Sequence, residues 1–514
     1  MQELSFSCSP EEAQDPPYLE KRIRKELGIL PKQELHFRWR KRSVDARNRH
    51  IKINASFDIW VDEPSTDRFE KYLFPEVHNA AEIHIIGAGP AGLFAALEAI
   101  LQGKKPIVFE RGKDVRNRRR DLAQLTKSSI LNPESNYCFG EGGAGTYSDG
   151  KLYTRSKKRG DVQKVMQLLV QFGATEDILV DAHPHIGTNK LPQLIVAIRE
   201  QIIACGGEIH FEHKLTEVFV ENDRIVSIEI NHAKKIQVEQ LILATGHSAR
   251  DIFHLLHQRS IEVKAKPFAL GVRVEHTQDF IDRLQYHGRL NDAFLPPSSY
   301  SLVTQVDGKG VYSFCMCPGG IIAPCATDQE EVVTNGWSPS KRNNPYANSG
   351  IVVSIDPSDF STPENPFVCL EFQQQIEKAC WEAAGKTQKV PAQCLQDFVQ
   401  KRKSTEFPRS SYQPGIISVE MDQLFPPFVV NRLRQAFKDF NQKMPGFITN
   451  DAVIHAPESR TSSPVLIPRD PETWQHPMVH NLYPCAEGAG YAGGIVSAAI
   501  DGMNCVTKIC QQAN

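Results

Sequence analysis

The chain of 514 residues lacks the features that mark membrane, secreted or nucleic-acid-binding proteins. No run approaches the roughly 18 consecutive apolar residues of a membrane span. The N-terminal stretch MQELSFSCSPEEAQDPP has no basic-then-apolar pattern of a secretory signal. The formal net charge is −2, which gives no global attraction to nucleic acid or anionic lipid. We therefore expect a cytoplasmic protein without a membrane partner.

The twelve cysteines form no arrangement typical of a disulfide framework or a zinc site. No C-x-x-C pair occurs, and the closest two are Cys315 and Cys317. In a long chain without an export signal, scattered cysteines are expected to be reduced thiols. Tetrahedral zinc sites use C-x2-4-C pairs with further ligands, so the sequence predicts no metal site.

The composition is that of a globular protein with more than one domain. Hydrophobic residues make up 40% and charged residues 23%, and the length exceeds what one hydrophobic core supports. Changes in pattern divide the chain into four segments, 1–78, 79–250, 251–425 and 426–514. The third mixes strand patterns with loops rich in Gly, Pro and Asn, which is typical of a domain inserted between two parts of another.

Residues 1–78 predict a small α+β domain. Strand patterns at 4–7, 34–43 and 51–61 and a helical pattern at 18–27 give the β-α-β-β order of a ferredoxin-like half-sandwich. Between residues 18 and 52, twelve Lys and Arg stand against four Asp and Glu, a balance of +8. This is either a docking surface for RNA or an acidic partner, or the solvated face of the strands and helix. Because no stacking motif accompanies the charge, we prefer the second interpretation.

The most specific motif is GAGPAG at 87–92, which follows a predicted strand (82–86) and opens a predicted helix (90–101). In such a unit Gly87 makes the tight turn, Gly89 lets the backbone approach a pyrophosphate, and Gly92 lets helix and strand pack closely. The helix N-terminus offers N–H groups and a positive dipole to the phosphates. Glu110 ends the next strand, 18 residues beyond Gly92, where an acid accepts hydrogen bonds from the adenosine ribose hydroxyls.

Two later stretches distinguish FAD from NAD. Together with GAGPAG, they resemble the FAD-binding Rossmann superfamily of the glutathione-reductase type; they are LILATGHSAR (241–250) and NLYPCAEGAGYAGG (481–494). The resemblance implies that residues 244–246 pass the pyrophosphate and that Glu487 lies near the ribityl chain. It also implies that a helix beginning near 493–494 points at the flavin pyrimidine edge, where its dipole stabilises the reduced flavin anion.

A closer resemblance covers nearly the whole chain. The sequence is similar to the family labelled FAD-dependent, or NAD(FAD)-utilising, dehydrogenases. The stretches that carry it are KRSVDARNRHIKI (41–53), CFGEGGAGTYSDGKL (138–152), PHIGTNKLPQLIVAIR (184–199), KPFALGVRVEHTQDFID (266–282), FCMCPGG (314–320), VTNGWS (333–338), ESRTSSPVLIPRD (458–470) and YPCAEGAGYAGGIVSAAIDG (483–502). We therefore expect an α/β fold: a Rossmann-type FAD-binding domain (79–250 and 426–514), an inserted mixed α+β substrate domain (251–425) and the small ferredoxin-like N-terminal domain (1–78).

The predicted FAD site combines the three motifs with a glycine-rich loop at 140–152. Relatives run this loop along the pyrophosphate and flavin, and backbone N–H groups in such a run can form an anion nest. The residues that we expect to bind FAD are Gly87, Gly89, Pro90, Ala91, Gly92, Glu110, Arg111, Gly142, Gly143, Ala144, Gly145, Leu215, Ala244, Thr245, Gly246, Glu487, Gly488, Gly493, Gly494 and Ile495.

The candidates for catalysis lie in the family-like stretches. Lys151 either polarises flavin N5 or O4, or is a surface lysine. Cys315 and Cys317 share one face of a predicted strand and can look into the same pocket, so either one of them is an active-site thiol facing the flavin, or both are buried apolar cysteines. Further polar candidates orient substrate or act as acid or base, or else make structural hydrogen bonds; they are His185, Arg273, Glu275, Asn335 and Arg460.

Two features of related reductases are missing from the sequence. Disulfide reductases of this fold carry a redox cysteine pair downstream of the first glycine motif, where this chain has only Cys138. A dithiol relay at that site is therefore not expected. A second G-x-G-x-x-G after a strand, which would hold NAD(P)H, is also missing. We expect NAD(P)H to act as a transient donor at the flavin face, or electrons to come from the substrate.

Three functions are compatible with these observations. The leading hypothesis is an oxidoreductase in which FAD exchanges a hydride with a small organic substrate enclosed by the inserted domain. An alternative is a flavin-dependent RNA-modifying enzyme that holds RNA with its basic N-terminal module. A third is a non-enzymatic flavin redox sensor. The sequence does not identify the substrate or the oligomeric state.

Overall fold

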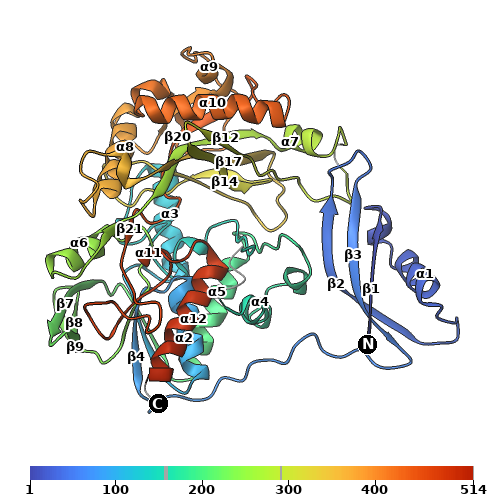
Figure 1. The fold of residues 1–514 in the computed structure, drawn as a ribbon, viewed down its shortest axis with the longest axis horizontal. Coiled ribbons are helices and arrows are strands. Elements are labelled where there is room, and N and C mark those ends of the chain that lie inside the picture. The colour runs from blue at the N-terminus through green and yellow to red at the C-terminus, as the bar shows by residue number, and fades with distance from the viewer. Residues whose placement is uncertain (155–159, 290–291, 513–514) are drawn as a thin grey trace.

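The first glycine motif lies in a five-stranded parallel sheet of the order β22-β10-β4-β5-β6. The computed structural model describes residues 1–154, 160–289 and 292–512 (Figure 1). β4 (Glu82–Ile86) leads into α2 (Pro90–Leu101), and α2 leads into β5 (Lys105–Glu110), which is the predicted β-α-β unit. The other strands are β6 (Glu208–Phe211), β10 (Leu241–Leu243) and β22 (Leu482–Pro484).

Both faces of this sheet are covered, which explains why β4 is apolar and buried from Ile83 onward. Helices pack on one face, where the hydrophobic core joins α2, α4 (Val162–Gln171), α5 (Leu191–Ala204) and α12 (Ile495–Gln512). An antiparallel three-stranded sheet and a helix pack on the other face: β7 (Leu215–Glu221), β8 (Arg224–Ile230), β9 (Lys234–Gln237) and α6 (Arg250–Gln258). The predicted Rossmann-type α/β fold is thus confirmed.

A seven-stranded mixed sheet forms the second domain, in the order β13-β14-β17-β12-β20-β18-β19. Helices α8 (Val368–Ala383), α9 (Leu395–Val399) and α10 (Pro427–Lys443) cover its outer face, and its other face turns toward the Rossmann domain (Figure 1). The strands are β12 (Phe268–Thr277), β13 (Val303–Val306), β14 (Lys309–Cys317), β17 (Tyr346–Ile355), β18 (Val390–Cys394), β19 (Ile416–Ser418) and β20 (Val453–Glu458). A hairpin of β15 (Ile321–Pro324) and β16 (Thr334–Trp337) accompanies it.

The second domain extends further along the chain than the predicted boundary at residue 425. α10 buries Leu433, Phe437 and Phe440 in the core of the seven-stranded sheet, and β20 pairs with β12. The chain returns to the Rossmann domain only after β20, through β21 (Val465–Leu466), which pairs with β11 (Lys264–Ala265). The amphipathic pattern of α10 predicted a helix, but such a pattern does not specify the sheet on which the helix packs.

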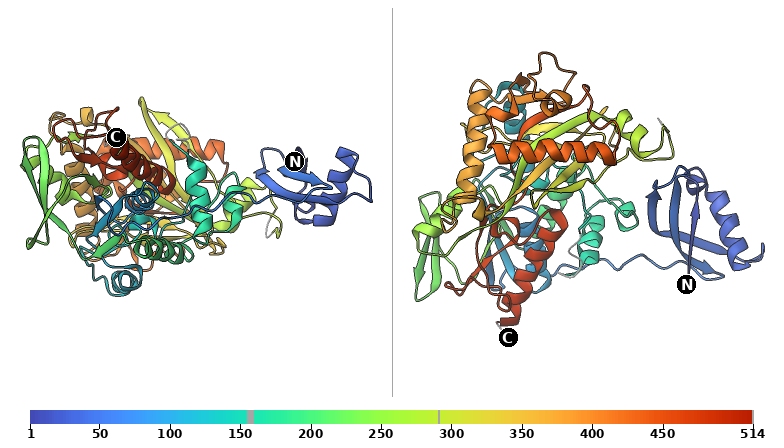
Figure 2. Two further views of the ribbon diagram at one scale, coloured as in Figure 1. Left: turned by 90° about the horizontal axis from the view of Figure 1, so that it is seen from below. Right: turned by 45° about the horizontal axis from the view of Figure 1, so that its top comes forward.

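The N-terminal domain stands to one side of the molecule (Figure 2). β1 (Gln2–Cys8), α1 (Pro16–Leu27), β2 (Leu35–Asp45) and β3 (Lys52–Val61) occur in the predicted β-α-β-β order, and the antiparallel sheet has the order β1-β3-β2. The Asp15 side chain caps α1 by accepting the Tyr18 N–H, and Gly28 ends it in the left-handed conformation. Arg42 joins the domain to the body, since its guanidinium pairs with Asp181 at 2.8 Å.

The remaining helices are α3 (Val115–Ser128), α7 (Gln278–Gln285) and α11 (Ala486–Ala489). Among the helices in the described ranges, none combines the length and the apolar character that a membrane span requires.

Candidate functional site

A cavity lies at the carboxyl ends of the Rossmann strands, where open α/β sheets bind their ligands. Its wall includes the ends of β4, β5 and β10, the starts of α2 and α12, and the loop between Cys138 and Lys151. The second domain contributes Cys315 from β14 and Asn335 from β16. The cavity is therefore built from both domains.

Most residues of the predicted FAD site line this cavity. They are Gly87, Gly89, Pro90, Ala91, Glu110, Arg111, Gly143, Ala144, Gly145, Leu215, Ala244, Thr245, Gly246, Glu487, Gly494 and Ile495. Four predicted residues lie outside the wall: Gly92, Gly142, Gly488 and Gly493. Among these four, Gly92 and Gly488 serve backbone packing, because an added Cβ would lie 1.8 Å from the Gly87 carbonyl oxygen and 2.7 Å from the Gly246 carbonyl oxygen, respectively.

The cavity wall has the shape and polarity that a dinucleotide phosphate requires. Within the described part of the chain, a Cβ added at Gly89 would meet only the Gly143 Cα, at 3.9 Å, and one added at Gly246 or Gly494 would meet nothing within 4 Å. The backbone thus leaves open space at three points of the wall. The buried Thr245 hydroxyl oxygen has no hydrogen-bond partner among the residues that the structure describes. The N-termini of α2 and α12 both reach the wall, so their N–H groups and dipoles favour an anion there.

Glu110 has a structural role in addition to the predicted contact with the adenosine ribose. Its carboxylate accepts the backbone N–H groups of Ala88 at 2.8 Å and of Gly112 and Gly140 at 2.9 Å each. It thereby holds the turn after β4, the end of β5 and the glycine-rich loop together. The carboxylate still lines the cavity, and the sequence interpretation anticipated only a contact with ribose.

Glu487 and Arg111 are likewise anchored by protein groups. The Glu487 carboxylate accepts the Gly494 N–H just before α12 and lies 3.8 Å from His247 Nε2. The Arg111 guanidinium pairs with Asp251 at the start of α6. Both side chains line the cavity in a fixed orientation, as positioned ligand-binding groups require.

Arg118 supports the glycine-rich loop and was not anticipated from the sequence. Its fully buried guanidinium donates hydrogen bonds to the carbonyl oxygens of Asn136 and Glu141 at 2.8 Å each, and of Gly143 at 2.8 Å. The stretch RNRRR at 116–120 did not indicate this role, because nothing in the sequence distinguishes Arg118 from the neighbouring arginines.

Lys151 lies at the centre of a charged cluster on the cavity wall. Its Nζ is 3.6 Å from Cys315 Sγ, 3.5 Å from Cys317 Sγ and 3.4 Å from the Asp149 carboxylate. The strand alternation breaks here, since Cys315 has φ +47° and the pairing with β17 shifts after Phe314. Both sulfurs therefore reach Lys151, but among the two thiols only Cys315 belongs to the cavity wall.

The cluster favours a thiolate at Cys315. A hydrogen bond from the Cys317 thiol lowers the pKa of Cys315 well below its usual value; burial opposes this shift, and the ammonium of Lys151 adds to it. The Cys317 pKa is raised, because its thiol is the donor of that hydrogen bond and is buried. The site thus places an ammonium beside a thiol whose pKa is lowered.

Replacing Lys151 with Met tests this pairing. Because an adjacent opposite charge lowers a pKa by about 1–3 units, we expect the pH of half-maximal Cys315 alkylation to rise by about one unit or more. The measurement is iodoacetamide labelling against pH, read by peptide mass spectrometry. Lys164→Met, which removes an ammonium paired with Glu98 at 2.5 Å and outside the cavity wall, serves as the control. An unchanged Cys315 profile in Lys151→Met would contradict the pairing.

Of the other catalytic candidates, Asn335 lines the cavity, whereas Arg273, Glu275 and His185 lie outside its wall and are hydrogen-bonded to protein groups. Arg273 forms two hydrogen bonds to Glu458, at 2.6 and 2.9 Å, and is fully buried. Glu275 accepts the Ser411 N–H at 2.9 Å, and His185 Nε2 lies 3.1 Å from the Ser340 carbonyl oxygen.

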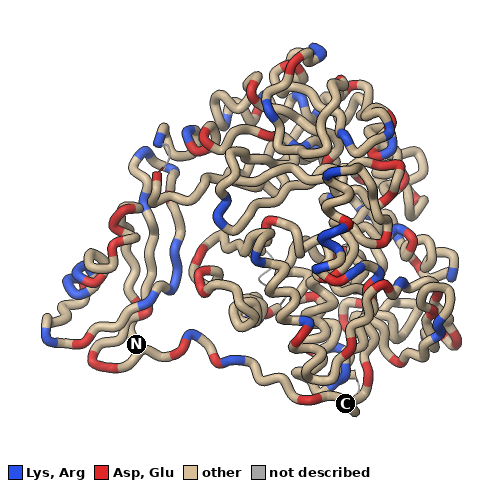
Figure 3. The backbone as a smooth tube through the Cα atoms, turned by 180° about the vertical axis from the view of Figure 1, so that it is seen from behind, with Lys and Arg blue, Asp and Glu red and all other residues tan. Residues whose placement is uncertain are grey.

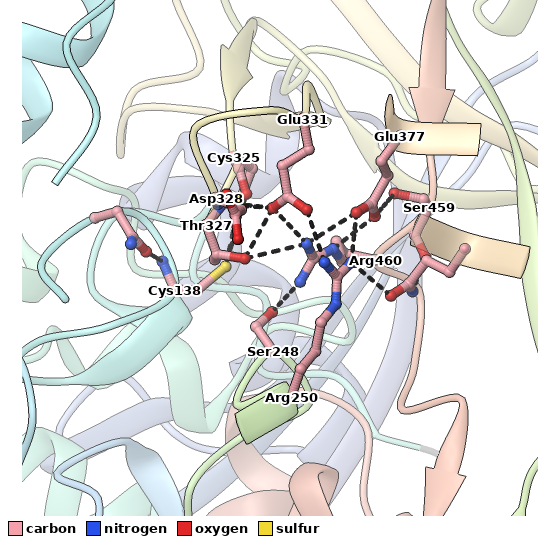
Figure 4. Close-up of polar contacts among 12 residues, drawn as sticks. Cys138, Ser248, Arg250, Cys325, Thr327, Asp328, Glu331, Glu377, Ser459 and Arg460 are labelled. Carbon is pink, nitrogen blue, oxygen red and sulfur yellow. Dashed lines mark hydrogen bonds and ion pairs between the residues drawn. The ribbon is translucent and has the colours of Figure 1, made fainter. Parts of the chain in front are cut away.

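Arg460 belongs to a buried network of four charges. Its guanidinium pairs with Glu377 at 2.8 Å and with Glu331 at 2.9 Å, and Arg250 also pairs with Glu331 at 2.7 Å (Figure 4). The network lies behind the cavity wall, which it touches through a 2.9 Å hydrogen bond from Arg460 to the Ser248 hydroxyl. The tertiary structure thus gives Arg460 a supporting position.

Cys138 has a partner that the sequence did not indicate. Its Sγ lies 3.7 Å from Cys325 Sγ, although 187 residues separate the two cysteines (Figure 4). Cys138 lines the cavity and Cys325 is buried behind it. The sequence shows only Cys138 in this region, for which no dithiol relay was expected; the tertiary structure places a second thiol beside it.

Comparison with known proteins assigns both large domains. Residues 81–264 match the model of the pyridine nucleotide-disulphide oxidoreductase family, and residues 267–461 match an FAD-dependent protein, C-terminal domain-like family. Residues 1–60 match a domain of unknown function. An uncharacterized protein of Clostridium beijerinckii is 36% identical over 520 residues, covering 96% of each chain.

Solved structures match at low identity. FqzB gives a TM-score of 0.35 at 13% identity, covering 84% of this chain and 77% of that chain. The glycerol-3-phosphate dehydrogenase from Bacillus halodurans, complexed with FAD, gives a TM-score of 0.35 at 9% identity, covering 85% and 65%. These similarities are too remote to indicate a substrate.

The family matches agree with the fold and with the cavity. The open backbone at Gly89 and Gly246 and the two helix N-termini fit the pyrophosphate of FAD. The chain belongs to the family of FAD-dependent oxidoreductases that combine a pyridine nucleotide-disulphide oxidoreductase domain with an FAD-dependent C-terminal domain, and its cofactor is FAD.

Proposed function

We propose that this oxidoreductase exchanges a hydride between FAD and a small organic substrate held between the Rossmann domain and the second domain. The observation that carries the proposal is the composition of the cavity wall. The wall passes continuously from the phosphate cradle at Gly89 to Lys151, Cys315 and Asn335. A cofactor cradle and reactive side chains of the second domain thus share one enclosed space.

The protein groups supply position and charge, while bound FAD supplies the two-electron chemistry. Gly89, Gly246 and Gly494 leave room for the pyrophosphate and the chain that follows it. The Lys151 ammonium, held by Asp149 and Cys315, places a positive charge at the cavity. A fixed positive charge in a partly dry site stabilises negative charge that develops on a bound group.

NAD(P)H remains our proposed transient donor. We expect the holoprotein, mixed anaerobically with NADH or NADPH, to lose its flavin absorbance at a rate that rises linearly with nucleotide concentration. The reason is that the sequence has no second glycine motif that would hold the nucleotide and so produce saturation. Stopped-flow absorbance measures this rate, and a screen of carbonyl, quinone and alkene acceptors for reoxidation then narrows the substrate class.

The result also separates the oxidoreductase from a sensor. A bound flavin that neither NAD(P)H nor any organic two-electron donor reduces, in a protein whose oligomeric state changes with redox potential, would contradict the proposal. That outcome would favour the sensor alternative instead.

The RNA-modifying alternative gains little support from the N-terminal domain, because acidic positions are interspersed among its basic ones (Figure 3) and six of the twelve Lys and Arg between residues 18 and 52 pair with acids. Arg38 pairs with Asp58 at 3.3 Å, and Arg42 pairs with Asp181 at 2.8 Å. Further pairs involve Arg22, Arg24, Arg40 and Arg47. A small-molecule substrate therefore agrees better with the distribution of charge.

A further inference from the structure

Cys138 and Cys325 are close enough to form a disulfide with a small movement. Their sulfurs are 3.7 Å apart, and a disulfide bond is about 2.05 Å long, so the sulfurs must approach by less than 2 Å. Cys138 comes from the loop after α3, and Cys325 follows β15 of the second domain. The pair joins the two domains at the cavity wall, which Cys138 lines.

The two thiols differ in the way that thiol–disulfide chemistry requires. A hydrogen bond from the Cys325 thiol lowers the pKa of Cys138 to about 6; burial opposes the shift, and the positive charge of Arg460 supports it. The same hydrogen bond and burial raise the pKa of Cys325. Cys138 is therefore the sulfur of the pair that ionises more readily. The thiolate is the reactive form of cysteine.

The segment that carries Cys325 is fixed to the buried charge network (Figure 4). The Glu331 carboxylate accepts the backbone N–H groups of Thr327 at 2.7 Å and Asp328 at 2.9 Å, and it pairs with Arg460. Arg460 in turn donates to Ser248, which lines the cavity near Cys138. Buried, hydrogen-bonded polar groups thus hold the segment of Cys325 in place beside Cys138. Reactive groups need such support to keep a fixed position.

A second close pair shows what a structural thiol contact looks like in this fold. Cys485 and Cys505 lie close together, with Asp501 beside them, and all three are buried. Neither cysteine lines the cavity. A hydrogen bond that the Cys485 thiol donates to Cys505, together with burial, raises the pKa of Cys485. Position at the cavity distinguishes the Cys138 pair from this one.

We propose that Cys138 and Cys325 form a redox-active dithiol–disulfide couple that exchanges two electrons with FAD. Oxidation joins the Cys138 thiolate and the Cys325 thiol in one S–S bond, releasing one proton and two electrons. Oxidised FAD takes up two electrons and one proton to give the anionic reduced flavin, so the exchange balances, and it runs in reverse when the disulfide is reduced. The inference rests on the proposed function, which supplies FAD as the two-electron partner.

Thiol counting tests bond formation without measuring activity. The holoprotein is treated with oxidised dithiothreitol or diamide, denatured in acid, alkylated with N-ethylmaleimide and digested. We expect free thiols to fall from twelve to ten, with a peptide linked through Cys138 and Cys325. A linked peptide through Cys315 and Cys317 instead, or twelve free thiols after oxidation, would overturn the proposal.

Electron counting tests exchange with the flavin. In anaerobic dithionite titration, the oxidised native holoprotein is expected to take up four electrons, two for FAD and two for the disulfide. Cys138→Ser and Cys325→Ser should each take up two. Cys510→Ser, whose thiol lies on α12 outside the cavity wall, should take up four. Each reduced holoprotein is then treated with one equivalent of a two-electron acceptor, to determine whether the electrons leave FAD or the dithiol.

The outcomes separate this inference from the function on which it rests. A protein that binds FAD and reduces an acceptor, but takes up only two electrons in the native form, retains the proposed function and refutes the dithiol couple. Equal electron uptake by native and Cys138→Ser protein refutes it as well. A chain that binds no FAD after reconstitution overturns both.

Discussion

Replacing Gly89 with Val is expected to give a folded chain that purifies without FAD. We expect the open space at Gly89 to hold the pyrophosphate, since among the described residues the atom nearest to an added Cβ is the Gly143 Cα, at 3.9 Å. A branched side chain fills it and removes hydrogen bonds from the start of α2 to the phosphates. Two such charge-assisted bonds, at about 1.5–3 kcal/mol each, correspond to a loss of about 10²–10⁴-fold in FAD affinity. Fluorescence titration of the apoprotein with FAD measures the affinity.

The stability of the apoprotein provides the matched comparison. We expect Gly89→Val apoprotein to unfold within about 1 kcal/mol of native apoprotein, because its backbone conformation is one that any residue adopts. Gly92→Ala should instead be strongly destabilised, because its Cβ would lie 1.8 Å from the Gly87 carbonyl oxygen and would push α2 from β4. Native FAD affinity in Gly89→Val would contradict the placement of the cofactor.

Replacing Arg460 with Ala is expected to cost about 3–5 kcal/mol of unfolding free energy, the range for breaking a buried ion pair from one side. The variant leaves Glu331 and Glu377 with a single cation, Arg250, in a region closed to water. Arg460 and Arg250 hold the pKa of Glu331 well below its usual range although burial alone would raise it. Removing Arg460 therefore leaves the negative charge of the buried Glu331 carboxylate with less positive charge beside it. Urea denaturation followed by circular dichroism measures the loss.

An exposed arginine supplies the control for this effect. Arg259 pairs with Glu217 at the surface, with half of its side chain exposed. Surface pairs contribute little because water and salt screen them, so Arg259→Ala should unfold at nearly the native urea midpoint. Equal midpoints for Arg460→Ala and Arg259→Ala would show that the buried network does not support the fold.

The cofactor site could be predicted from the sequence because its signals are local. The strand at 82–86 and the helix at 90–101 were expected with the bounds that β4 and α2 show. A glycine that must turn, approach a phosphate or pack closely acts within a few residues of its own position. The packing role of Gly92 was expected from the motif, whereas that of Gly488 was not, since a motif does not tell which of its glycines faces the ligand.

The reactive thiols could not be predicted in the same way, because their partners come from distant parts of the chain. Cys315 and Cys317 were expected on one strand face, but a shift in pairing after Phe314 gives them different exposure to the cavity. The end of the second domain was misplaced for a related reason. The apolar face of α10 is visible in the sequence, whereas the surface that covers it is not.

The sequence by itself determined the Rossmann unit, the choice of FAD and the loops that surround it, because each depends on glycines, a helix start and an acid at short spacing. Only the tertiary structure decided the chemistry next to the cofactor. It brought Cys325 to Cys138, set Lys151 beside Cys315, and enclosed Arg460 among carboxylates. Such contacts depend on how two domains pack, and packing is a property of whole surfaces that no single stretch of sequence contains.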